Sequence, residues 1–242
     1  MNPVRSHMTV QKLHKNTFPN ESSKYRKARN KLLVAEINLR KKLSDVASLR
    51  MKLPRGGQLK EDYTFDEIKN GKTVKTKFSS LFDGKKNSLI IYSMMYDPKW
   101  TEACPYCTSI LDGLEGAAHN VNHQTNFIVI SKAPIQKLET WKKKRDWNNL
   151  RLLSSFNNSY NRDYFAEDPK GEQIPALNVF QKTSKGIFHF YNTELLYAPS
   201  EKGQDARHVD LIWPIWNLFD LTPEGRGKWF ADNSRPRKKV SQ

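Results

Sequence analysis

The chain has 242 residues and a formal net charge of +16 at pH 7, from 41 lysines and arginines against 25 aspartates and glutamates. A hydrophobic content of 37% over this length allows one substantial core with polar extensions. No apolar run approaches the length of a membrane span, and the first residues lack the apolar core of a secretory signal. We therefore expect a cytoplasmic protein with no membrane partner.

The positive charge gathers in the N-terminal region, in the run Lys142–Arg145 and in residues 235–239. No aromatic RNA-binding motif, zinc-finger pattern or basic leucine zipper accompanies it. Solvated faces and tails explain this charge better than a nucleic-acid partner, which we do not expect.

The two ends of the chain, residues 1–23 and 231–242, are polar and basic and are predicted to be disordered. Residues 24–55 are predicted to form one long amphipathic helix, because apolar residues recur at three- and four-residue steps until Leu53-Pro54 ends the pattern. The apolar stripe resembles a short coiled-coil seam. This favours partial burial on the chain's own domain together with a homodimer.

A second domain is predicted over residues 56–230, built on two apolar runs that have the length of buried strands, Leu89–Met95 and Asn126–Ser131. Their near-continuous apolar character is typical of a parallel sheet covered on both faces. The other predicted elements are short strands at 63–65 and 72–74 around the turn Asn70-Gly71, a helical turn at 78–81, a helix from 133 to 144, a short strand at 151–153, a loop at 154–164, a hairpin of strands at 174–180 and 186–191, and a last helix or turn at 210–219.

The only two cysteines form the motif Cys104-Pro105-Tyr106-Cys107, directly after the first buried run and at the predicted start of a helix. At a helix N-cap, a Cys104 thiolate is stabilised by unpaired backbone N–H groups and the helix dipole, and Pro105 suits the first helical position. Cys107 lies about one turn further along the same side. The motif therefore predicts a dithiol redox site in which Cys104 attacks a disulfide and Cys107 resolves the product.

Three other interpretations of the cysteines stay open. His119 and His123 share a helical face and could complete a zinc site with the two thiols. The pair could instead form a structural disulfide, although so short a loop stabilises little, or remain two inert buried thiols. We favour the redox interpretation and expect neither a metal nor a cofactor.

The order of the predicted elements is similar to that of the thioredoxin fold: α/β, with a central mixed sheet flanked by helices, here with a long N-terminal helical extension. Ile174-Pro175 stands before the final hairpin, where that fold has a proline facing the cysteines. The resemblance implies that Pro175 is cis and faces Cys104; an ordinary trans proline at a strand start is the alternative.

Dispersed motifs over residues 24–226 also resemble the thioredoxin-like family catalogued as domain of unknown function 899 (DUF899). These motifs are Leu53-Pro54, Asp62-Tyr63-Thr64-Phe65, Leu81-Phe82-Asp83-Gly84, Met95-Tyr96-Asp97-Pro98-Lys99-Trp100 with the cysteine motif, Ser131-Lys132-Ala133-Pro134, Ser154-Ser155 with Asn161 and Asp163, and Asp220-Leu221-Thr222-Pro223-Glu224-Gly225-Arg226. The chain departs from the family pattern at Lys132, where arginine is common, and at Ser159, where an acidic residue is usual. Ala103 replaces the tryptophan of thioredoxin itself.

The leading hypothesis is a thiol–disulfide oxidoreductase with Cys104 and Cys107 catalytic and a substrate groove shaped by Ile174-Pro175, Trp100 and Tyr106. The expected partner is a disulfide-containing protein or a small-molecule thiol such as glutathione, because the Pro-Tyr pair inside the motif is typical of glutaredoxins. Two alternatives remain.

The first alternative is a thiol peroxidase, in which Thr101 orients the peroxide three residues before Cys104, as in peroxiredoxins, with Arg145 or Arg162 as the required arginine. The second is a non-catalytic binding module of the same fold, which would hold a partner through the long basic helix and the aromatic loop.

Overall fold

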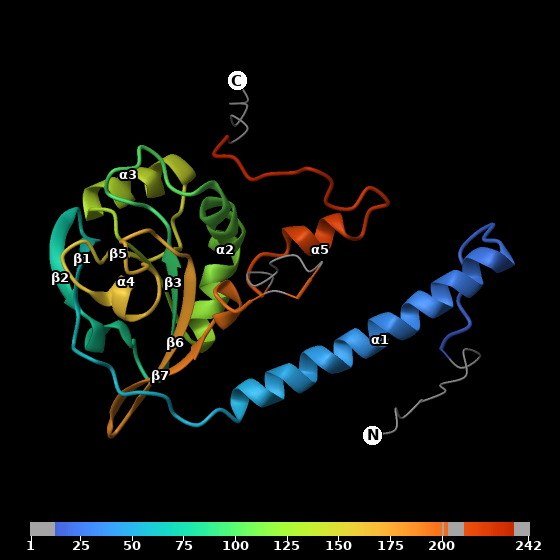
Figure 1. Cartoon of the computed structure of the whole chain (residues 1–242), viewed down its shortest axis with the longest axis horizontal. Helices are drawn as coiled ribbons and strands as arrows, with labels where there is room; N and C mark the ends of the chain where they lie inside the picture. Colours follow the sequence, from blue (N-terminus) through green and yellow to red (C-terminus); the bar gives the residue numbers. More distant parts are fainter. Residues whose placement is uncertain (1–12, 200, 203–210, 235–242) are drawn as a thin grey trace. The chain divides into compact units, whose positions relative to one another are not determined.

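The computed structural model describes residues 13–199, 201–202 and 211–234 (Figure 1). The chain divides into two units, Met1–Pro54 and Arg55–Gln242. Of the segments predicted to be disordered, residues 1–12 and 235–242 lie outside the described residues, as does Asp210 at the start of the last predicted helix. None of the described helices combines the length and the apolar character needed to cross a bilayer.

The first unit contains the predicted long helix, α1 (Ser23–Met51). Ser22 caps it, because its hydroxyl accepts a hydrogen bond from the Tyr25 N–H at 3.1 Å. No α1 residue is buried, and leucines of its apolar stripe such as Leu39 and Leu43 are exposed. The pairing of α1 with a second copy of the chain stays a prediction.

The second unit is built on a seven-stranded mixed sheet with the order β2-β1-β5-β4-β3-β6-β7. The central strands β3, β4 and β5 are parallel, whereas β6 runs antiparallel to β3 and β1 runs antiparallel to β5. The strands are β1 (Thr64–Lys69), β2 (Lys72–Lys77), β3 (Ser88–Met94), β4 (Asn126–Ser131), β5 (Leu152–Ser154), β6 (Ala176–Thr183) and β7 (Gly186–Asn192).

Each face of this sheet carries its own hydrophobic core. One core joins the sheet to α2 and α3 through buried residues such as Val129, Ile110 and Leu138. The other is an aromatic cluster under η2 and α4, in which the ring centroids of Phe78 and Phe180 lie 4.8 Å apart. The helices of this unit are η2 (Phe78–Leu81), α2 (Pro105–Gln124), α3 (Ile135–Arg145), α4 (Tyr160–Asp163), η3 (Glu194–Leu196) and α5 (Ile215–Phe219).

The path of the chain through the sheet defines the fold class. Strand β3, helix α2, strand β4 and helix α3 form a parallel β-α-β unit, and the hairpin β6–β7 then pairs with the opposite side of β3. This β4-β3-β6-β7 core is the thioredoxin fold (Figure 1). The predicted fold class is therefore confirmed, together with its N-terminal helical extension.

Two features of this unit were not predicted: a helical turn and the attachment of the β1–β2 hairpin. The segment 154–164, predicted as a loop, contains the single turn α4. Strand β5 joins the β1–β2 hairpin to the central sheet through the pair Asp66 and Ser154. The buried Glu67 carboxylate strengthens this junction, because it accepts hydrogen bonds from Arg151 at 2.8 and 3.0 Å.

Helices α2 and α3 are held together by a polar contact at the margin of their core. The carboxylate of Asp112 on α2 accepts two hydrogen bonds from the buried guanidinium of Arg145 on α3. The same carboxylate accepts a hydrogen bond from the Trp147 indole N–H at 2.9 Å. One carboxylate thus accepts three hydrogen bonds from two residues, Arg145 and Trp147.

The two edges of the sheet are covered in different ways. Strand β2 presents the exposed side chains of Lys72, Lys75 and Lys77. Strand β7 is covered by the segment 56–59, which exchanges backbone hydrogen bonds with His189 and, through Leu59 N–H at 2.8 Å, with Ile187. The β7 edge is therefore partly paired, and the β2 edge carries positive charges that oppose pairing with another strand.

The close approach of this covering segment predicts a difference between two adjacent glycines. A Cβ added at Gly56 would lie 2.7 Å from the His189 carbonyl oxygen, whereas one added at Gly57 meets nothing within 4 Å. We expect Gly56→Ala to lower the free energy of unfolding by about 1–3 kcal/mol, because a backbone atom must move. Gly57→Ala is the matched control and should change it by less than about 1 kcal/mol. Urea denaturation measures both, and equal effects would contradict the steric account.

Candidate active site

Cys104 lies where the loop after β3 turns into α2. Its N–H donates a hydrogen bond to the Met95 carbonyl at 3.0 Å, and its own carbonyl accepts one from Thr108 N–H at 2.9 Å. Pro105 occupies the first helical position, where its missing N–H is not needed. The predicted N-cap position of Cys104 is therefore present in the structure.

The surroundings of Cys104 favour its thiolate. Hydrogen bonding from the Cys107 side chain, assisted by the backbone N–H groups of Cys107 and Tyr106, lowers the pKa of Cys104 from 9.0 to about 6. Partial burial acts in the opposite direction and is outweighed. At neutral pH, a half-buried thiol of this kind is mostly ionised and can act as a nucleophile.

Cys107 has the opposite character. It is buried, and donation to the Cys104 thiolate together with desolvation raises its pKa well above the ordinary value of a thiol. The Tyr92 hydroxyl, also fully buried, acts at Cys107 as a hydrogen-bonding group that lowers the pKa of that thiol. Among the described residues this hydroxyl forms no hydrogen bond of ordinary geometry. Tyr92 was not identified from the sequence, because nothing in the alternation of β3 marks it.

The loop that leads to the motif is fixed by two side chains, one from α3 and one from the loop itself. The Lys137 ammonium on α3 donates to the carbonyls of Pro98 at 2.9 Å and of Trp100. The Tyr96 hydroxyl donates to the Thr101 carbonyl at 3.2 Å. The sequence alone did not indicate the role of Lys137, which lies more than thirty residues from the loop it holds.

The three predicted site residues close to the motif have different environments. Trp100 is half-buried against the core, and Thr101 is exposed. Tyr106 packs edge-on against Trp213, with 5.6 Å between ring centroids. The Trp229 ring also packs edge-on against Tyr106, with 6.4 Å between ring centroids. Aromatic residues from the C-terminal part of the chain therefore border the motif.

Ile174 and Pro175 come to the same end of the sheet. Ala176 pairs with Ser93 near the end of β3, and Pro175 therefore stands beside the stretch in which Met95 holds Cys104. All peptide bonds among the described residues are trans, so the prediction that Pro175 is cis is wrong. The trans form is favoured by about 0.5–1 kcal/mol for an X–Pro bond.

The zinc alternative does not fit the structure. His119 and His123 lie on one face of α2, with 4.4 Å between ring centroids. At 1.5 Å per residue, the 12 residues from Cys107 to His119 span about 18 Å of helix, too far for one ion. No cluster of three potential metal ligands occurs within the described ranges.

Fold and site together define a dithiol protein of thioredoxin-like fold. The chain belongs to the family described as "Bacterial protein of unknown function (DUF899)", which matches residues 15–240. The resemblance inferred from the sequence motifs is thereby confirmed. No curated protein matches the chain significantly in sequence.

Solved structures similar to the chain include several peroxiredoxins. The peroxidoxin BcpB of Mycobacterium tuberculosis has 14% identity and a TM-score of 0.45, covering 67% of this chain and 95% of its own. Reduced Prx3 of Vibrio vulnificus in complex with H₂O₂ has 12% identity and a TM-score of 0.43, covering 63% and 92%. The mitochondrial 2-Cys peroxiredoxin of Plasmodium falciparum has 15% identity and a TM-score of 0.42, covering 70% and 94%. Likeness at this level bears on neither activity nor mechanism.

Proposed function

We propose that this protein is a thiol–disulfide oxidoreductase in which Cys104 attacks and Cys107 resolves. The observation that carries the proposal is the placement of the two thiols, with Cys104 half-buried at the N-cap of α2 and Cys107 buried one turn further in. This placement lowers the pKa of Cys104 to about 6 and raises that of Cys107. One thiol is ionised and half-buried, and its neighbour is protonated and buried. This is the division of roles that disulfide exchange requires.

The reaction balances as a two-electron transfer. The Cys104 thiolate attacks one sulfur of a substrate disulfide, forming a mixed disulfide and releasing the first substrate thiolate. Cys107 then loses its proton and attacks the Cys104 sulfur, which forms the Cys104–Cys107 disulfide and releases the second thiolate. One of the two released thiolates takes up the proton that Cys107 loses, and the other takes one from the solvent, into which Cys104 had already released its own. Two molecules of a small thiol such as glutathione then reduce the protein disulfide and are themselves joined in a disulfide.

Substrate contacts are proposed for the residues bordering the motif: Trp100, Tyr106, Ile174 and Pro175. The half-buried rings of Trp100 and Tyr106 offer apolar surface beside the thiolate. The partner we propose is a protein disulfide or a small-molecule disulfide. A dithiol that must start reduced is suited to the reducing cytoplasm, which we propose as its location.

Peroxide reduction is the competing activity at the same thiolate. It needs an arginine near the sulfur, and of the two arginines considered, Arg145 is buried and bonded to Asp112. Arg162 is exposed and remains the candidate partner of Thr101 for this chemistry. A low thiolate pKa serves both reactions, so only turnover separates them.

Insulin-disulfide reduction and peroxide consumption, measured on the same preparations, test the proposal. We expect disulfide turnover in the wild type, its loss in Cys104→Ser, and trapping of a mixed disulfide in Cys107→Ser. Thr101→Ala serves as the control, since it should leave disulfide reduction unchanged. Peroxide turnover without disulfide turnover would replace the proposal by the peroxidase, and an inert Cys104 would replace it by the binding module.

A further inference from the structure

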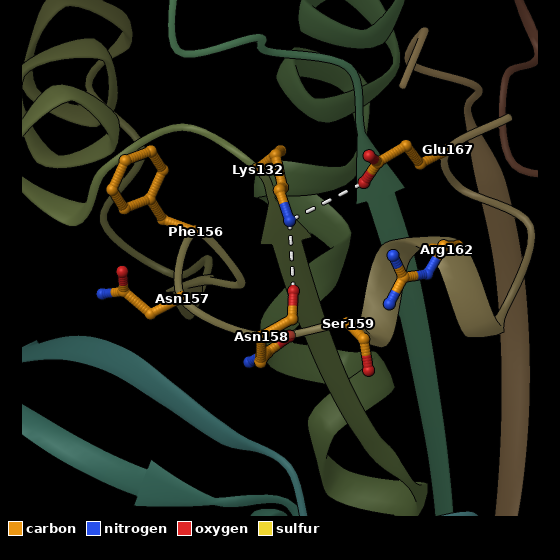
Figure 2. Close-up of a pocket in the computed structure, with 7 residues that line it drawn as sticks. All are labelled: Lys132, Phe156, Asn157, Asn158, Ser159, Arg162 and Glu167. Carbon is orange, nitrogen blue, oxygen red and sulfur yellow. Dashed lines mark hydrogen bonds and ion pairs between the residues drawn. The ribbon is translucent and has the colours of Figure 1, made fainter. Parts of the chain in front are cut away.

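A polar pocket of about 280 Å³ opens at the carboxyl ends of β4 and β5. It is lined by residues from the loop after β4, the segment after β5, α4 and the loop before β6 (Figure 2). These residues are Lys132, Phe156, Asn157, Asn158, Ser159, Arg162 and Glu167.

Two charged groups in this pocket lack a full set of partners. The Glu167 Oε2 atom is buried without a hydrogen bond, although the Lys132 ammonium lies 3.7 Å away. The exposed guanidinium of Arg162 makes no hydrogen bond or ion pair within the part of the chain that the structure describes. In Figure 2 the Lys132, Glu167 and Arg162 side chains point toward one another from separate segments.

Lys132 is itself held in place. Its ammonium donates to the Asn158 carbonyl at 3.1 Å, so one of its three donors is committed to the wall of the pocket. The pocket therefore offers a fixed cation, a guanidinium without a partner among the described residues, and a carboxylate that is ion-paired with Lys132 but accepts no hydrogen bond at its Oε2 atom. A simple anion would satisfy Arg162 but would be repelled by Glu167, whereas a group carrying both an ammonium and a carboxylate would satisfy both.

The pocket and Cys104 lie toward the same end of the sheet. Ser131 at the end of β4 pairs with Met94, which places Lys132 across from Met95, the residue whose carbonyl accepts the Cys104 N–H. On the other side, Glu167 forms a bridge with Gln173, immediately before Ile174-Pro175.

We propose that this pocket binds the zwitterionic α-amino-acid group of a small thiol or disulfide substrate, whose sulfur then reaches Cys104. Arg162 receives the carboxylate as a bidentate pair, and Glu167 accepts from the ammonium. The delivery of the substrate sulfur to Cys104 rests on the proposed function. The binding of the amino-acid group itself requires no redox step.

Calorimetric titration of the reduced protein with S-methylglutathione, which has no reactive thiol, tests the inference. We expect saturable binding that weakens at least tenfold in Arg162→Gln, because one charged bidentate contact is lost. Glu167→Gln should weaken it and should also erase the preference over the analogue that lacks the α-amino group. Lys170→Gln removes the same charge from a nearby exposed turn and is the matched control, expected to bind like the wild type.

Other outcomes separate this inference from the proposed function. Equal binding by Arg162→Gln and wild type, or no binding at millimolar ligand, overturns the pocket while leaving reduction of the neutral bis(2-hydroxyethyl) disulfide by Cys104 intact. Equal binding of acetate or phosphate also overturns it, in favour of a simple anion site. S-methyl-L-cysteine, compared with S-methylglutathione, distinguishes an amino-acid thiol from a γ-glutamyl peptide as the source of the group.

Discussion

Alkylation of the reduced protein by iodoacetamide should follow a single titration with its midpoint near pH 6, and one thiol should react. The pKa of Cys104 is lowered to about 6, so the reactive thiolate is lost as pH falls through that value and makes up about 90% of the group at pH 7. Cys107 is buried with its pKa raised and should stay unmodified. Mass spectrometry of the product identifies the labelled cysteine.

Variants at Cys107 separate the causes of this low pKa. Hydrogen bonding from the Cys107 side chain is the largest of them. Cys107→Ala removes that donor and should move the midpoint upward toward the ordinary value of 9.0, whereas Cys107→Ser keeps a donor and should move it less. A wild-type midpoint at or above pH 8 would contradict the assigned environment and remove the main support for the oxidoreductase.

Asp112→Ala should lower the free energy of unfolding by about 3 kcal/mol, because it leaves a buried guanidinium without its carboxylate. Arg145 is 4% exposed and donates twice to Asp112, which also accepts from the Trp147 indole. Urea denaturation followed by tryptophan fluorescence measures the loss. The contact joins α2 to α3, so the loss should appear in the global transition rather than in local fraying.

The control for this prediction is the surface pair on α3 formed by half-buried Glu139 and exposed Lys143, whose charged atoms are 3.9 Å apart. Glu139→Ala should cost no more than about 0.5 kcal/mol, the usual value of such a surface pair. Adding Arg145→Met to Asp112→Ala should restore part of the stability, since no buried charge then remains. If Asp112→Ala costs no more than Glu139→Ala, the pair does not hold the two helices together.

The strands at the centre of the fold could be predicted, because each buried strand is a continuous run of apolar residues in the sequence. Residues 89–95 and 126–131 correspond closely to β3 and β4, and Asn70-Gly71 forms the predicted turn, both residues having positive φ. The attachment of the β1–β2 hairpin could not be predicted. It depends on pairing between residues almost ninety positions apart, such as Asp66 with Ser154, and a three-residue strand carries little pattern of its own.

The site was predictable where chemistry follows from spacing and not where it follows from packing. The N-cap position of Cys104 follows from the Cys-Pro-Tyr-Cys order next to an apolar run. The contacts of Tyr92 with Cys107 and of Lys137 with the loop carbonyls depend on how β3 and α3 pack around the loop. Pro175 was assigned a cis bond by resemblance alone, and that part was wrong.

The treatment of the two sheet edges has a consequence for behaviour at high concentration. Lysines at positions 72, 75 and 77 place positive charges along β2, and the segment 56–59 already pairs with Ile187 and His189 of β7. A strand from another molecule would meet like charge at one edge and an existing strand-like segment at the other. Growth of the sheet from molecule to molecule, the first step of amyloid-like aggregation, is therefore opposed at both ends. Any assembly of this chain should proceed through helices or loops.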